Sequence, residues 1–155
     1  MLARSLIALI ATLAPVQLLQ ARTSDPTADQ AAQAYVQGRL AMANDDYAAA
    51  TALFGTALKG ERDEMLTRRS LDVAMLSGDM AAAVRLANQI ALPEKSDPST
   101  AIADSIVALI RAAGAAAARD WRAYDAARTA FAAPGRGGES GQVLGVLLDA
   151  WGKAA

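Results

Sequence analysis

Two short stretches of the sequence decide its fold: NDDYAAA at residues 44–50 and SGDMAAA at residues 77–83. In each, an acidic residue precedes a large apolar residue, Tyr47 or Met80, which begins an alanine-rich run. The two large residues lie 33 positions apart. Recurrence with a period of about 20–50 residues is typical of repeat architectures. Because each stretch begins with a short polar segment, NDD or SGD, it predicts a turn between two helices.

Apolar residues recur at helical spacing on both sides of each turn, and a third copy of the turn ends at Trp121. The helices predicted around the three turns cover residues 34–43, 47–58, 65–76, 80–90, 102–118 and 121–133. A loop at 92–99 accounts for the longer spacing, 41 positions, between Met80 and Trp121. A connector rich in glycine at 134–141 precedes a last apolar helix near residues 143–151.

Residues that cap helices stand at the expected boundaries. Asp63 and Asp79 are predicted to cap the helices that follow them, and Ser99 or Thr100 the helix after Pro98. The pattern therefore predicts an all-α domain of about three helical hairpins and a terminal helix, covering residues 31–155.

Composition excludes several classes of function. The 155 residues include no cysteine and no histidine, which removes thiolate and imidazole metal ligands, cysteine nucleophiles and serine triads. The net charge is −1, so nucleic-acid binding is not expected.

The acidic groups at 45–46 and 61–64 lie at predicted turns, where carboxylates cap helices. We therefore predict no catalytic residue, no metal site and no cofactor. An enzyme that uses carboxylates, serine or lysine is the alternative.

The first 22 residues differ from the rest of the chain. Arg4 precedes an apolar run over residues 5–14, which is the length of the hydrophobic region in a secretory signal, and Pro15 ends it. Residues 1–22 are predicted to be a signal peptide or an uncleaved N-terminal anchor, and residues 23–30 a polar linker. A buried first helix is the third interpretation. Membrane contact is expected only through this segment, if it stays attached.

Several small and aromatic residues resemble the landmarks of the tetratricopeptide repeat, whose pattern is W-x2-L-G-x2-Y followed by A-x3-F over about 34 residues. The landmarks are Gly38, Tyr47, Ala50, Phe54, Ala57, Gly78, Met80, Ala83 and Trp121. The likeness is strongest over residues 31–59 and continues by periodicity to residue 133. Leu71 and Ala87 depart from it, standing where the family has glycine and phenylalanine. The resemblance implies a right-handed α-solenoid of alanine-rich, bacterial type.

In this family the first helix of each repeat lines a concave groove that binds partner segments. The resemblance implies that six residues face this groove: Tyr35, Arg39, Met42, Arg68, Asp72 and Met75. The alternative is that these residues do not bind a partner. Arginine on a helix is usually exposed to solvent, and methionine is usually part of the core.

The expected function is a non-catalytic scaffold that binds a protein or peptide in the bacterial periplasm or cell envelope. The alternative is a membrane-tethered structural or oligomerisation module that keeps its N-terminal anchor. The last helix carries more apolar residues than one neighbour can bury, among them Val143, Leu147 and Trp151. This end of the domain is predicted to self-associate, to dock a partner or to continue into further repeats.

Overall fold

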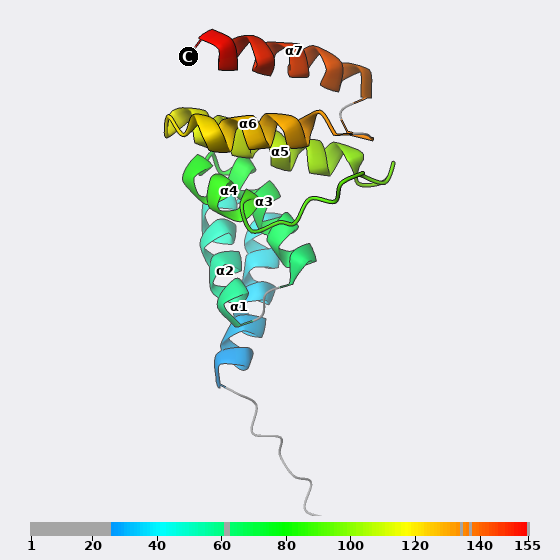
Figure 1. The fold of residues 1–155 in the computed structure, drawn as a ribbon. Coiled ribbons are helices and arrows are strands. Elements are labelled where there is room, and N and C mark those ends of the chain that lie inside the picture. Colours follow the sequence, from blue (N-terminus) through cyan, green and yellow to red (C-terminus); the bar gives the residue numbers. More distant parts are fainter. Residues whose placement is uncertain (1–25, 61–62, 134, 137, 155) are drawn as a thin grey trace, which may run out of the picture.

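The computed structural model describes residues 26–60, 63–133, 135–136 and 138–154, and within them the chain forms seven helices and no strand. The prediction of an all-α protein is confirmed. The helices are α1 (Pro26–Ala43), α2 (Tyr47–Gly60), α3 (Glu64–Leu76), α4 (Met80–Ala87), α5 (Ala101–Ala117), α6 (Trp121–Phe131) and α7 (Gly138–Ala154). Each helix packs against the next one along the chain. Figure 1 shows the hairpins following one another along the molecule, with α1 and α2 at one end and α7 at the other.

The α1–α2, α3–α4 and α5–α6 hairpins are closed by the same turn. Its first residue has a left-handed backbone, with φ of 59° at Asp45, 74° at Gly78 and 56° at Arg119. The next residue is an aspartate whose backbone N–H donates to a carbonyl oxygen in the preceding helix, with an N–O distance of 2.9 Å in all three turns. The carboxylate of that aspartate accepts the N–H three residues later at 3.0, 2.8 and 3.0 Å, which caps the second helix. These three capping residues are Asp46, Asp79 and Asp120.

Equivalent positions after the three turns are buried. Counting from Tyr47, Met80 and Trp121, the third following residue is buried in every hairpin, and so is the tenth. These residues are Ala50, Ala83 and Tyr124 at the third position, and Ala57, Ile90 and Phe131 at the tenth. The turn residues Met80 and Trp121 themselves stay exposed. The same positions after each turn are therefore buried in the core, within α2 and α6 and, at Ile90, just beyond the end of α4.

Gly38 is required by a close approach between α1 and α2. A Cβ atom at this position would lie 2.8 Å from the ring of Phe54, which is completely buried. Phe54 packs with Ala50 and Val73, and Tyr35, Met42 and Leu66 cover that cluster. The landmark residues of the first hairpin thus form the contact that joins its two helices.

Polar side chains fix the loop between α4 and α5. The carboxylate of Asp104, 1% exposed, accepts hydrogen bonds from Ser96 Oγ at 2.6 Å, Arg68 Nη2 at 2.9 Å and Thr100 Oγ1 at 3.2 Å. Arg136, which is also buried, donates to Ser96 Oγ at 2.9 Å. This cluster ties α3, the loop, α5 and the segment before α7 together.

Several predicted boundaries need correction. Residues 26–30 of the predicted linker are helical, because α1 begins at Pro26, and proline suits the first position of a helix. Helix α4 ends at Ala87 instead of residue 90, and α7 begins at Gly138, inside the predicted connector 134–141. Asp63 and Asp79 cap as predicted, whereas Thr100 holds the cap position of α5 without a capping hydrogen bond from its side chain. The predicted signal segment, residues 1–22, lies outside the described residues.

Candidate partner-binding groove

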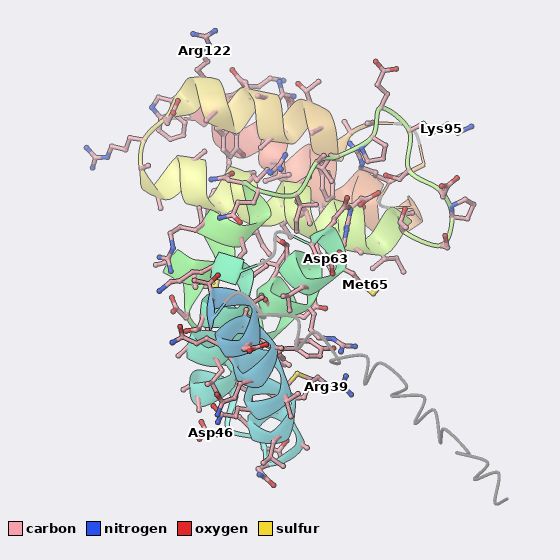
Figure 2. All side chains as sticks on the ribbon, turned by 90° about the horizontal axis from the view of Figure 1, so that it is seen from below. Arg39, Asp46, Asp63, Met65, Lys95 and Arg122 are labelled. Carbon is pink, nitrogen blue, oxygen red and sulfur yellow. The ribbon has the colours of Figure 1, made fainter. Side chains whose placement is uncertain are left out.

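A groove of about 450 Å³ lies between α1, the end of α2 and α3. Its apolar lining comes mainly from short side chains, together with Met65 and Leu66 at the start of α3. Tyr35 and Arg69 line it from α1 and α3. In Figure 2, Arg39 and Met65 lie on the same side of the molecule, and Arg122 projects from its far end.

Two guanidinium groups converge on one hydroxyl at this groove. The Tyr35 hydroxyl accepts hydrogen bonds from Arg39 Nη1 at 3.2 Å and from Arg69 Nη1 at 3.4 Å. The Tyr35 ring lies 5.9 Å, between centroids, from the ring of Phe54, which holds it in place. The hydrogen bond from Arg39 lowers the pKa of Tyr35 below its usual value.

Both arginines are exposed, and no described carboxylate forms an ion pair with either. Arginine binds carboxylates through paired N–H groups in a fixed geometry. Arg39 and Arg69 therefore offer a positive rim that can receive an acidic group beside an apolar floor.

The other residues predicted for the groove have different surroundings. Met42 is half-buried against the Phe54 cluster, and Met75 lies exposed near the end of α3. Asp72 is exposed on α3, and desolvation raises its pKa although Arg69 and Arg68 act in the opposite direction. Arg68 is engaged within the fold, because it forms ion pairs with Glu64 at 3.0 Å and with Asp104 at 2.9 Å.

Arg69 lines the groove, whereas the resemblance implies its neighbour Arg68. Successive residues of a helix point about 100° apart, so adjacent arginines serve different faces. Arg69 follows Met65 by four positions, and both line the groove. Residues four positions apart share a helix face, so this spacing in the sequence indicates that Arg69 lies on the same side of α3 as Met65.

The described aspartates of the two acidic groups, at 45–46 and 61–64, form hydrogen bonds within the fold. Asp45 accepts a hydrogen bond from the Tyr47 hydroxyl at 2.8 Å, and Asp46 caps α2. Both oxygens of Asp63 accept N–H groups at the start of α3. Glu61 and Arg62 lie outside the described residues. Within the described ranges, no three potential metal-ligating residues gather in one place.

No protein-family model, curated protein or solved structure matches this chain. Across the part of the chain that the structure covers, no helix has the length and apolarity needed to cross a membrane.

Proposed function

We propose that this chain is a non-catalytic scaffold of the tetratricopeptide type, a solenoid whose α1–α3 groove binds an extended protein or peptide segment. The solenoid assignment is supported by the turn that recurs at Asp46, Asp79 and Asp120, and by the matching buried positions after it. Helical hairpins of this kind stack because one hairpin alone cannot bury its apolar face.

The observation that carries the binding proposal is the convergence of Arg39 and Arg69 on Tyr35 above an apolar groove. The chemistry favours a partner segment with an apolar side chain next to an acidic one. The apolar side chain would enter between Ala32, Ala57 and Leu66, and the carboxylate would bridge the two guanidinium groups. Because the floor is lined by small residues, a medium-sized aliphatic side chain fits it better than a charged one.

Selection from a library of random peptides tests this proposal. We expect peptides that bind the wild-type chain to share an acidic residue beside an aliphatic one. Arg39→Glu/Arg69→Glu should weaken their binding by at least about 10-fold, because it places like charges at the rim. The matched control is Arg85→Glu/Arg122→Glu, which makes the same charge change at exposed arginines elsewhere on the molecule. Equal loss of binding in both variants would contradict the groove assignment.

Export to the periplasm or envelope is a further part of the proposal, supported by the apolar run at residues 5–14 after Arg4. Expression of the full chain in a bacterial host, followed by intact mass measurement, tests it. A mature chain that begins near Arg22 supports an exported scaffold. A chain that retains residues 1–22 and fractionates with membranes supports the tethered module instead.

A further inference from the structure

Helix α7 faces the rest of the molecule with its small residues. Gly141 is buried, and a Cβ at this position would lie 3.9 Å from the Phe131 ring, while a Cβ at Gly152 would lie 3.0 Å from the Tyr124 ring. Leu148 packs on the same side, where its carbonyl accepts the Tyr124 hydroxyl hydrogen bond at 2.6 Å. The glycines therefore let α7 approach α6 closely.

The opposite side of α7 carries large apolar residues. Val143 is 64% exposed and Trp151 70%, and Leu144, Val146 and Leu147 are exposed with them. A contiguous exposed apolar face of this kind marks an interaction surface. Figure 1 shows α7 at one end of the described fold, where no described element covers its outer side.

An apolar groove lies directly beside this face. It has a volume of about 690 Å³ between α5, α6 and α7, and Leu109, Ala113, Trp121 and Trp151 line it. The ridge formed by Val143, Leu147 and Trp151 thus stands next to a hollow of the same chemistry. A ridge beside a hollow can complement itself when two copies are related by a two-fold axis.

The two charged residues of α7 whose side chains the structure describes, Asp149 and Lys153, are already paired within the chain. Asp149 accepts from Arg128 Nη1 at 2.9 Å and from Lys153 Nζ at 2.6 Å, along one edge of the helix. Among the described residues, the apolar face therefore offers no unpaired charge with which to select a charged partner. The same apolar face of a second copy is therefore a suitable partner for it.

The exposed area is sufficient for a dimer. Together with Trp121, the exposed side chains of α7 present apolar surface on the order of 600 Å² per chain, given about 150–250 Å² for each aromatic residue. Two such faces would bury on the order of 1,200 Å², which is the lower end of the range for stable interfaces, about 1,200–2,000 Å².

We propose that two copies of this chain pair through the outer face of α7 and the groove beside it. This interface lies at the far end from the α1–α3 groove, so the dimer carries two separate partner-binding grooves. The proposal does not depend on the peptide-binding function.

Sedimentation velocity of the full chain over about a hundredfold range of concentration tests this proposal. We expect the wild type to dimerise, and Val143→Glu/Leu147→Glu to raise the dissociation constant by at least about 100-fold. The matched control is Val36→Glu/Leu40→Glu on α1, where a valine and a leucine four residues apart are similarly exposed, at 64% and 63%. It should dimerise like the wild type. The apolar run at residues 5–14 is common to all three chains, so association through it would be unchanged.

Fluorescence of Trp151 gives a second measurement. In a Trp121→Phe background, Trp151 is the sole tryptophan, and its quenching by acrylamide should decrease as dimers form. Circular dichroism should show the same helix content in all variants, because the substituted residues are exposed. A monomeric wild type would leave this face to a partner of different sequence and overturn the proposal. Dimerisation that survives Val143→Glu/Leu147→Glu, or that the α1 variant abolishes, would also overturn it.

Discussion

Arg119 occupies a backbone conformation that suits glycine. It takes the left-handed position of the third turn, with φ of 56°, where the second turn has Gly78. The left-handed region costs a residue with a side chain about 1–2 kcal/mol. Glycine escapes this cost but loses more entropy on folding.

Arg119→Gly should therefore stabilise the protein by about 0.5–1 kcal/mol. Urea denaturation followed by circular dichroism measures the change. The reverse substitution, Gly78→Ala, should destabilise by about 1 kcal/mol, because it creates the same strain in the second turn. A stabilising Gly78→Ala would show that the turns are not equivalent.

Two helical glycines should respond to alanine with opposite signs. Gly38→Ala places a Cβ 2.8 Å from the buried Phe54 ring, and the overpacking should exceed the gain in helix propensity. We expect a net loss on the order of 1–2 kcal/mol in the free energy of unfolding. Gly55→Ala meets no atom within 4 Å and should instead gain about 1 kcal/mol. Thermal and urea unfolding of both variants measures the difference, and equal effects would contradict the close approach of α1 and α2.

The helices were predictable from the sequence because their apolar residues recur at helical spacing, but some of their ends were not. The last turn predicted for α4 is absent, and Arg111 of α5 donates to the carbonyls of Ala87 and Ile90 in that region. A side chain more than 20 positions away supplies those bonds, and the local pattern contains no sign of it. The start of α1, in contrast, has a local signal in the sequence, because proline is favoured at the first position of a helix and α1 begins at Pro26.

The candidate groove was predictable only in part. Tyr35 and Arg39 follow from the resemblance and lie together as an i, i+4 pair. The resemblance implies Arg68 and not Arg69, because the sequence alone does not show that Asp104, 36 positions later, binds Arg68. Buried ion pairs between distant elements are set by tertiary structure and leave no local pattern.

The cluster at Asp104 should make stability depend on acid pH. Burial raises the pKa of Asp104, but hydrogen bonds from Ser96, Arg68 and Thr100 outweigh it, so the pKa lies below its ordinary value. A carboxyl group with a lowered pKa in the folded state contributes stability above its unfolded pKa, which is about 4. That contribution is lost as the pH falls through the lowered folded pKa.

The free energy of unfolding should therefore decrease as the pH is lowered from about 5, and Asp104→Asn should make the decrease shallower. Urea titrations at a series of pH values measure both slopes. Asp104→Asn should also lower stability at neutral pH, because it removes the charge that pairs with Arg68. Identical acid slopes in wild type and variant would contradict a linked Asp104.

At the scale of the whole molecule, stability should vary along the stack of helices. Helix α5 contains many buried residues, including Val107, Ala108 and Ala112, and it packs against both α4 and α6. Helix α7 packs against α6 through Leu148 and leaves its other large apolar residues exposed. Elements with few buried apolar contacts open at lower free energies than the core.

Hydrogen exchange followed by mass spectrometry should reveal this gradient. At low protein concentration we expect the amides of α7 to exchange at least about 100-fold faster than those of α5, because α7 can detach without disrupting the hairpin core. If α7 pairs with a second copy, its exchange should slow as the concentration rises while exchange in α5 stays constant. Val143→Glu/Leu147→Glu is the control, since it should abolish the concentration dependence and preserve the protection of α5. Equal protection of α5 and α7 at every concentration would contradict an independently opening terminal helix.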